Sequence, residues 1–285
     1  MSDLLSYRHS YHAGNFADVI KHLTVVEIFR HLLQKDSAFH YFDTHAGAGV
    51  YDLRSEHATK LHEHREGISR LSAREWPELE TWFAAIDAVN HVHVSGDTMR
   101  FYPGSPVLAQ HFLRRQDKAW LFELHSQDRE LLAERMRRDR RVRVIAADGF
   151  QGVLALLPPV TRRGFVLIDP SYEIKHDFET VVEIVAQAHR KFSTGIYAIW
   201  YPVVERRRVE ALERRLVETG IRNIQRFELA VAPDSAAGGM RAAGMIVINP
   251  PWTLRATMST LLPRLVDTLA QGDGAFFRCD TLVDE

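Results

Sequence analysis

Residues 164–173 of this 285-residue chain read GFVLIDPSYE, and this stretch decides the fold. The consecutive apolar residues 165–168 are typical of a short strand buried on both faces. An acid, a proline and an aromatic residue follow at once in Asp169, Pro170 and Tyr172. A parallel strand delivers the residues after it to the carboxyl edge of its sheet, where open α/β folds bind ligands. The stretch therefore predicts an α/β fold with a polar site at this strand end.

Further apolar runs and helical patterns alternate on both sides of this stretch. Strands are expected at 38–42, 119–123, 142–146, 195–200, 224–231 and 243–248, and helices at 16–33, 106–115, 126–138, 153–157, 180–192 and 204–219. Strands that alternate with helices indicate a parallel, doubly wound sheet. A Gly-rich loop without a helical pattern joins the last two strands, which predicts a final antiparallel pair. The expected sheet thus has seven strands, mostly parallel, with an antiparallel last strand.

Residues 51–101 differ from the rest of the chain. They are rich in His, Glu, Arg and Trp, and their pattern is helical. We predict a small helical insertion subdomain at 51–101, within a Rossmann-like domain made of 1–50 and 102–285. After the insertion, Ser105 is expected to be the N-cap of the next helix and Pro106 its first residue.

The composition limits the class of protein. The hydrophobic content is 46%, and no run of apolar residues is long enough to span a membrane. The N-terminus has no secretory signal, and the single cysteine, Cys279, suits the cytoplasm. A net charge of −1 argues against non-specific coating of nucleic acid. Arginine clusters at 135–143, 162–163 and 206–208 are either solvated faces or local contacts to a phosphate backbone. A monomer is expected, because no long apolar surface helix is evident.

Acids or glycines follow the first four expected strands. Residues 43–49 read DTHAGAG, Glu123 ends the second strand, Asp148 and Gly149 follow the third, and Asp169 follows the fourth. Small residues let a backbone approach a ligand closely. An acid that opens the first loop would repel a pyrophosphate but attract a sulfonium, which favours S-adenosylmethionine over NAD. Glu123 suits ribose hydroxyls, and Asp148 suits an adenine amino group. Each acid alone could instead be a loop acid in contact with water.

The tetrapeptide 169–172 resembles the catalytic Asp/Asn-Pro-Pro-Tyr/Phe/Trp motif of amino-group methyltransferases, with Ser171 in place of the second proline. The exocyclic amine of adenine is a poor nucleophile, because its lone pair is delocalised into the ring. Two preorganised acceptors for its N–H bonds favour tetrahedral nitrogen. Asp169 would be one acceptor and would take the proton, the Pro170 carbonyl would be the second, and Tyr172 would stack on an extruded base. A plain Asp-Pro turn is the alternative.

Longer segments are similar to the RlmJ family of 23S rRNA adenine-N6 methyltransferases. These segments are 6–15 together with Asp18, Lys21 and His22, and then 43–49, 102–106, 123–125, 147–150, 200–204 and 244–252. The similarity spans nearly the whole chain. It implies a Rossmann-like class I methyltransferase that uses S-adenosylmethionine to methylate the N6 amine of one adenine in 23S rRNA. The resemblance also implies action before subunit assembly is complete. A base must leave its stack to present its amine, and this costs least for an unpaired base, so we expect a flipped-out base and naked rRNA as the substrate.

The resemblance also assigns site residues by position. It places the cofactor against His22, His45, Ser105, Glu123, Asp148, Gly149 and Asp169, and the substrate RNA near Tyr7, His9 and Lys21. Residues 1–22 would fold over the cofactor site. The family commonly has proline at position 171, so Ser171 removes one rigid ring and adds an N–H.

Two other features compete for the site. Residues 249–252 read NPPW and match the tetrapeptide more closely by letter. If the strand before them is antiparallel, they lie at the opposite edge of the sheet, so we interpret them as a structural turn with Trp252 packed. His9, His12 and His22 could suggest a metal, but no cysteine is near, and structural zinc sites usually carry thiolates. No metal is expected.

The chemistry of the tetrapeptide leaves the substrate open. DNA adenine-N6 methyltransferases and protein glutamine methyltransferases use the same motif. An alternative of a different class is a non-catalytic RNA-binding module, which would bind RNA without binding S-adenosylmethionine. The acids and glycines at the strand ends count against such a module, because a pure binder has no use for them.

Overall fold

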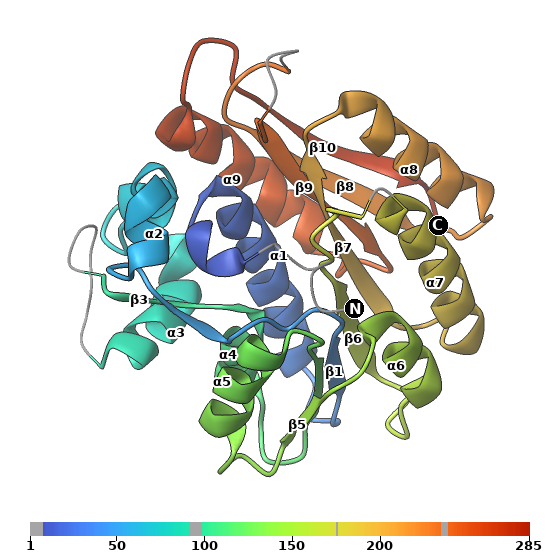
Figure 1. Cartoon of the computed structure of the whole chain (residues 1–285). Coiled ribbons are helices and arrows are strands. Elements are labelled where there is room, and N and C mark those ends of the chain that lie inside the picture. Colours follow the sequence, from blue (N-terminus) through green and yellow to red (C-terminus); the bar gives the residue numbers. More distant parts are fainter. Residues whose placement is uncertain (1–7, 92–98, 175, 235–238) are drawn as a thin grey trace.

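The computed structural model describes residues 8–91, 99–174, 176–234 and 239–285. One sheet runs through the molecule, with helices on both of its faces (Figure 1). Its strands, in the order β10-β8-β9-β7-β6-β1-β4-β5, are β1 (His40–Asp43), β4 (Lys118–Phe122), β5 (Val142–Ile145), β6 (Gly164–Ile168), β7 (Ile196–Val203), β8 (Ile224–Ala230), β9 (Ala242–Ile248) and β10 (Phe276–Val283).

The sheet is mixed but mostly parallel. Strands β5, β4, β1, β6 and β7 pair in parallel, whereas β9 is antiparallel to both β7 and β8. This confirms the α/β fold and the antiparallel arrangement at the end of the chain. The expected number of seven strands is wrong, because β10 adds an eighth strand, antiparallel to β8. As an edge strand it is only half-buried and carries polar residues, so it lacks the apolar run of an inner strand.

The helices form two layers. They are α1 (Phe16–Leu33), α2 (Glu56–Leu61), α3 (Glu80–Asn90), α4 (Ser105–Phe112), α5 (Ser126–Met136), α6 (Gly149–Leu156), α7 (Asp177–Lys191), α8 (Arg206–Glu218) and α9 (Leu254–Leu269). Residues of α1, α4 and α9 belong to one hydrophobic core, and residues of α6, α7 and α8 to the other. Successive side chains of β6 alternate between them: Phe165 lies in the first core and Val166 in the second.

Helix α1 positions part of the site. It has the bounds predicted from the sequence, and the Asn15 side chain caps it by accepting from the N–H groups of Ala17 and Asp18. The helix is buried around nearly its whole circumference, including the polar residues Asp18, Lys21 and His22. Buried charged groups are rare unless they are paired, so these residues need partners inside the protein.

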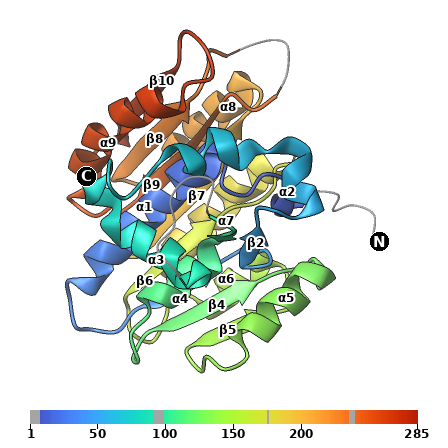
Figure 2. The ribbon, with the colours of Figure 1, turned by 90° about the vertical axis from the view of Figure 1, so that its left-hand side faces the viewer.

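Residues 50–91 and 99–103 lie on the α1 side of the sheet (Figure 2). Two short strands, β2 (Val50–Asp52) and β3 (Phe101–Pro103), pair antiparallel and bring the ends of this segment together. Between them lie α2, short 3-10 turns and α3. Trp82 and Ile86 of α3 are fully buried in the same core as α1. None of the described helices is both long and apolar enough to cross a lipid bilayer.

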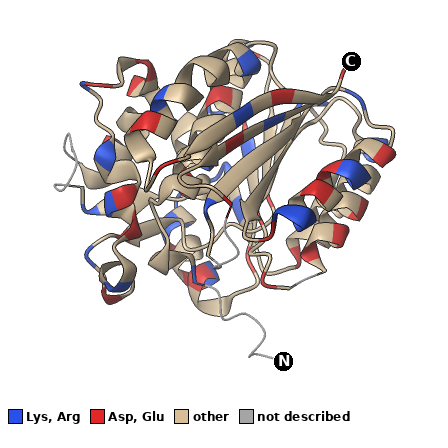
Figure 3. Cartoon of the chain, turned by 90° about the horizontal axis from the view of Figure 1, so that it is seen from above, with Lys and Arg blue, Asp and Glu red and all other residues tan. Residues whose placement is uncertain are grey.

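Charges of both signs alternate over the surface of the described chain (Figure 3). Several arginines of the clusters noted above are paired with acids. Arg141 contacts Asp139 at 2.6 Å, and Arg206 contacts the buried Glu228 at 2.7 Å and Asp234 at 2.8 Å. For these members, the structure supports the interpretation of paired surface charges.

Candidate active site

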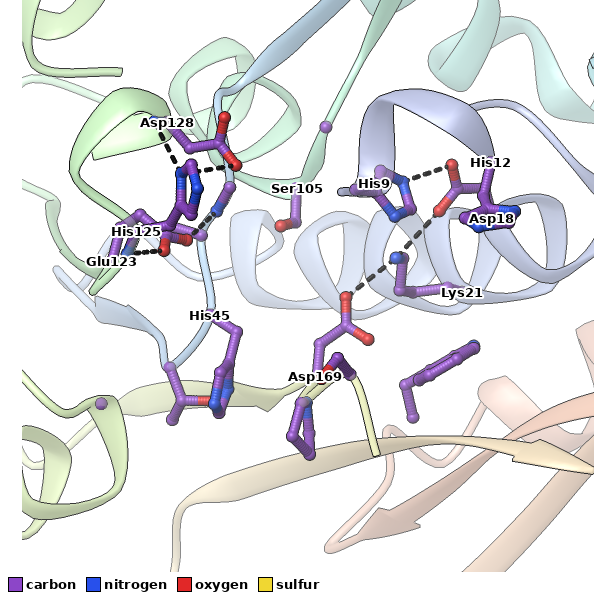
Figure 4. Close-up of a pocket in the computed structure, with 18 of the residues that line it drawn as sticks. His9, His12, Asp18, Lys21, His45, Ser105, Glu123, His125, Asp128 and Asp169 are labelled. Carbon is purple, nitrogen blue, oxygen red and sulfur yellow. Dashed lines mark hydrogen bonds and ion pairs between the residues drawn. The ribbon is translucent and has the colours of Figure 1, made fainter. Parts of the chain in front are cut away.

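A cavity of about 530 Å³ opens at the carboxyl edge of β1, β4, β6 and β7 (Figure 4). The predicted site residues that line it are His9, Lys21, His22, His45, Ser105, Glu123, Asp148, Gly149, Asp169 and Pro170. Tyr7 lies outside the described residues. The volume is in the range of pockets that bind small molecules and cofactors. The fold therefore brings together residues that are far apart in the sequence.

Glu123 follows β4 and is held by backbone donors. The Gly47 N–H donates to Oε2 and the His125 N–H to Oε1, both at 2.7 Å. Burial raises the pKa of Glu123. A carboxylate has about four lone-pair positions, so its two oxygens retain acceptor capacity toward the cavity. This arrangement suits a ligand that presents hydroxyl groups.

Asp148 and Gly149 begin α6 under the loop after β1. Asp148 caps the helix, because its Oδ1 accepts from the Phe150 N–H at 2.8 Å. A Cβ at Gly149 would lie 1.9 Å from the carbonyl oxygen of Thr44, so only glycine permits this approach. The helix starts four residues earlier than the 153–157 segment predicted from the sequence, because the cap is Asp148.

His45 and His22 are both neutral at pH 7. Burial lowers the pKa of His45 to about 4 and that of His22 to about 3. The Nδ1 of His45 lies 2.8 Å from Thr44 Oγ1, and the Nδ1 of His22 lies 2.7 Å from the Tyr102 hydroxyl. Neutral imidazoles do not repel a cationic ligand.

Ser105 does not cap α4, contrary to prediction. The N-cap is Gly104, and Ser105 is the first residue of the helix. Its hydroxyl instead donates to Oδ2 of Asp43 at 2.6 Å, and the Tyr41 hydroxyl donates to the same oxygen at 2.8 Å. Asp43 is fully buried, and this raises its pKa to about 6. A buried carboxylate without hydrogen-bond donors costs more free energy than a helix end without a side-chain cap. The Ser105 hydroxyl therefore pairs with Asp43 rather than with the start of α4.

Asp169 follows β6 and forms a largely buried ion pair with Lys21 of α1. Lys21 Nζ lies 2.8 Å from Asp169 Oδ2 and also 2.8 Å from Asp18 Oδ1. Burial raises the pKa of Asp169, and the Lys21 ammonium offsets part of this rise. Among the described residues, Lys21 occupies only one oxygen of Asp169, which leaves Oδ1 as an acceptor. Pro170 and Ser171 follow it along the cavity wall.

Tyr172 is part of the wall behind the cavity rather than of its lining. Its hydroxyl donates to the Trp200 carbonyl at 2.7 Å, and its ring packs against Phe178 with centroids 4.4 Å apart. Trp200, within β7, does line the cavity, and the Lys21 ammonium lies 5.6 Å from its ring centroid. Stacking of a base on Tyr172 therefore stays a prediction. The aromatic segment 200–204 was the only sign in the sequence that Trp200 belongs to the site.

Asn249 lies at the opposite edge of the sheet, as its position after an antiparallel strand predicts. Its amide donates to the carbonyls of Ser193 and Gly195, both at 2.8 Å and just before β7. The position of residues 249–252 at the opposite edge of the sheet, on which their interpretation as a structural turn depends, is confirmed. The expectation that Trp252 is packed is wrong, because 81% of this residue is exposed. Within the described ranges, no three His, Cys, Asp or Glu side chains are grouped to hold a metal ion.

Comparison with known proteins gives a family match over most of the chain. Residues 36–280 match the family described as ribosomal RNA large subunit methyltransferase D, RlmJ. The chain is 51% identical over 264 residues to the ribosomal RNA large subunit methyltransferase J of Escherichia coli (strain K12), covering 92% of this chain and 93% of that protein. It is 46% identical over 277 residues to the Haemophilus influenzae protein of the same name, covering 96% and 97%.

A solved structure supports the same fold. The crystal structure of a Legionella pneumophila protein superposes on this chain with a TM-score of 0.85 at 34% sequence identity. The match covers 95% of this chain and 98% of that one. The fold is thus shared with that protein over nearly the full length of both chains.

Proposed function

The chain belongs to the RlmJ family of ribosomal RNA large subunit methyltransferases, and we propose that it methylates the N6 amine of an adenine in 23S rRNA. The observation that carries this proposal is the placement of Asp169. It ends β6 at the floor of the cavity, one oxygen is fixed by Lys21, and the Pro170 carbonyl follows directly in the chain. These two acceptors match the two N–H bonds of an exocyclic amine.

The cavity fits S-adenosylmethionine, which the methyltransferase family implies. The close approach of Gly149 to Thr44 leaves a backbone-lined cradle, and the carboxylates of Glu123 and Asp148 border it. Glu123 would hold the ribose hydroxyls, and Asp148 would hold the adenine amino group. When bound, this cofactor supplies an electrophilic methyl group on a sulfonium centre.

The residues of the chain prepare the amine for attack. Asp169 Oδ1 and the Pro170 carbonyl would accept its N–H bonds and favour tetrahedral nitrogen, so that its lone pair points to the methyl carbon. As the new nitrogen–carbon bond formed, the sulfur–methyl bond would break with its electron pair left on the thioether sulfur, and the surplus proton on the nitrogen would pass to Asp169 and then to water. Lys21 favours the ionised form of Asp169 before the step, because its positive charge opposes the effect of burial.

The substrate must expose one base. An adenine inside a stack cannot reach Asp169, so the base is flipped out, at a cost of a few kcal/mol that is smallest for an unpaired base. We therefore propose naked 23S rRNA in the cytoplasm as the substrate, before the large subunit is assembled. Tyr172 would support the aromatic wall beside the base, and Tyr7, His9 and Lys21 are the residues expected to contact the RNA. We also propose a monomer with residues 51–101 as an insertion subdomain.

Transfer of a radiolabelled methyl group tests the substrate and the catalytic residue. Label from S-adenosylmethionine should enter naked 23S rRNA as N6-methyladenosine, and much less should enter assembled subunits. Asp169→Asn should lower the rate by about 10²–10⁴-fold, as expected for loss of a general base. Asp117→Asn is a matched control, since Asp117 is buried at the other edge and pairs with Arg114.

Each alternative function has its own result in this assay. Label in DNA or in a release-factor protein, but not in RNA, would replace the RNA substrate by one of those. RNA binding without any S-adenosylhomocysteine binding would indicate a non-catalytic module. An active Asp169→Asn variant beside an inactive Asn249→Ala variant would move the catalytic centre to the opposite edge.

A further inference from the structure

Asp18 is the best-connected charged group in the cavity wall that the mechanism above does not use. Only 1% of its side chain is exposed. Oδ2 accepts from the Gly14 N–H at 2.8 Å and lies 2.9 Å from His9 Nε2. Oδ1 lies 2.8 Å from Lys21 Nζ. One carboxylate therefore joins the segment before α1 to the lysine that holds Asp169.

The geometry of Lys21 explains why this connection matters. A lysine side chain has many rotamers, and its ammonium is a compact, strongly hydrated charge that resists burial. Two carboxylates at 2.8 Å, one on each side, hold Lys21 Nζ in the wall of the cavity (Figure 4). If only Asp169 were present, the ammonium would have one partner and a route back to solvent. Asp18 thus anchors Lys21 from one side, and Lys21 in turn contacts Asp169, the carboxylate of the proposed mechanism.

We propose that Asp18 is a positioning residue, which holds Lys21 against Asp169 and makes this ion pair depend on the seating of His9 and Gly14. This inference rests on the proposed function, because it concerns the same carboxylate. Asp18 touches neither cofactor nor base in this role. It acts through Lys21, and the contacts of His9 and Gly14 tie it to the segment that precedes α1.

The direction of the pH effect separates positioning from a structural role. Asp18 and Asp169 carry like charges, so removing the Asp18 charge while Lys21 stays in place lowers the pKa of Asp169. If the loss of Asp18 instead lets Lys21 move away from Asp169, the pKa of Asp169 rises, because the Lys21 charge no longer offsets the effect of burial. The titratable groups that face this cluster from the surrounding elements are His9, His12, His22, Tyr41, Asp43, Glu63, Tyr102 and Tyr172.

The test uses Asp18→Asn in the full chain, with Lys21→Met and the double variant beside it. For Asp18→Asn, we expect kcat to fall by about 10²-fold, the loss typical of a misplacement of about 1 Å, with little change in KM for S-adenosylmethionine. The acid limb of the kcat profile should move to higher pH, as in Lys21→Met. In the double variant, the second substitution should add almost nothing, because both act through one contact. Asp117→Asn should show neither change.

Measuring the pKa of Asp169 without catalytic turnover keeps this inference separate from the assignment of the substrate. In protein labelled with ¹³C at the aspartate carboxyls, the Asp169 signal, identified by its loss in Asp169→Asn, reports the pKa of that group directly. A higher pKa of Asp169 in Asp18→Asn supports the inference, even if the wild-type protein methylates no RNA. An unchanged or lower pKa overturns it, even if the wild-type protein is active.

A stability control completes the design. Thermal unfolding and S-adenosylhomocysteine affinity are measured for each variant. If Asp18→Asn does not fold, Asp18→Ser takes its place, because it also removes the carboxylate that holds Lys21, and the same rise in the pKa of Asp169 is expected. Additive losses of kcat in the double variant would also overturn the inference, because they would show that Asp18 and Lys21 act independently.

Discussion

Replacing Gly149 by alanine tests whether the cofactor cavity depends on the contact between α6 and the loop after β1. The added Cβ would lie 1.9 Å from the Thr44 carbonyl oxygen and 2.6 Å from the Thr44 carbonyl carbon and Cα. Real Cβ atoms essentially never come within 3.0 Å of such atoms, so one backbone segment must move by about 1 Å. Both segments belong to the cavity wall.

Two effects oppose each other in this variant. Alanine is a better helix former than glycine, by up to about 1 kcal/mol inside a helix. Overpacking costs about 1–3 kcal/mol, and the obstructing atoms at Thr44 are backbone atoms, which cannot rotate away. The clash therefore outweighs the gain in helix propensity. A shift of about 1 Å in a binding wall can cost about 10²-fold, so the loss of cofactor affinity should exceed the loss of stability.

Calorimetric titration with S-adenosylhomocysteine and thermal unfolding measure both losses. Gly149→Ala should bind about 10–10²-fold more weakly, and its Tm should fall by about 2–4 °C for each kcal/mol lost. Gly272→Ala is the matched control, because no atom lies within 4 Å of its Cβ position and its φ is not positive. It should match the wild type in both measurements. Wild-type affinity in Gly149→Ala would refute the role of this close approach.

Three further predictions concern single side chains. Asn249→Ala should keep methyl transfer but lose about 1–3 kcal/mol of unfolding free energy, because the Ser193 and Gly195 carbonyls lose their donor. Tyr172→Phe should lose about 1 kcal/mol in urea unfolding, because the hydrogen bond to the Trp200 carbonyl disappears. The pKa of Asp43 is about 6 in the folded chain and 3.8 ordinarily. The folded state thus binds the proton more tightly, so the unfolding free energy of the wild type, relative to Asp43→Asn, should fall as pH rises from 4 to 6.

The inner part of the sheet could be predicted because its strands are buried on both faces. Residues 164–168 are apolar throughout, and so short an apolar run is typical of a strand buried on both faces. Strand β10 lies at the edge and mixes Arg278 and Asp280 with apolar residues, so it carries no such signal. Helix α9 was not predicted either. Pro263 lies inside it, and a proline in a helical pattern usually marks an end or a kink.

The site could be predicted in part for a related reason. Residues at the ends of parallel strands must meet at one edge, so the positions of Glu123, Asp148 and Asp169 follow from the order of the strands. The contact between Lys21 and Asp169 joins residues 148 positions apart, on a helix and a strand end. No pattern in the sequence encodes which helix crosses over that edge. The orientation of Tyr172 was equally inaccessible, because it depends on its positive φ of 55° and on the carbonyl of a neighbouring strand.

The charges around the cavity suit a reaction that moves a positive charge over a short distance. Asp18 and Asp43 are buried and Asp169 is largely buried, and among the described residues the ammonium beside them is that of Lys21, while the neighbouring His22 and His45 are neutral. Even with Asp43 partly protonated near pH 6, ionised carboxylates outnumber the ammonium, so the wall favours a cation. In the proposed reaction, methyl transfer would remove the positive charge from sulfur and create it on the amine beside Asp169. Because the carboxylates are held by Lys21, Ser105 and Tyr41, they need little reorganisation as the charge moves. In the proposed reaction, the ion pair would thus do more than neutralise Asp169, because it would also fix the acceptor that the departing proton requires.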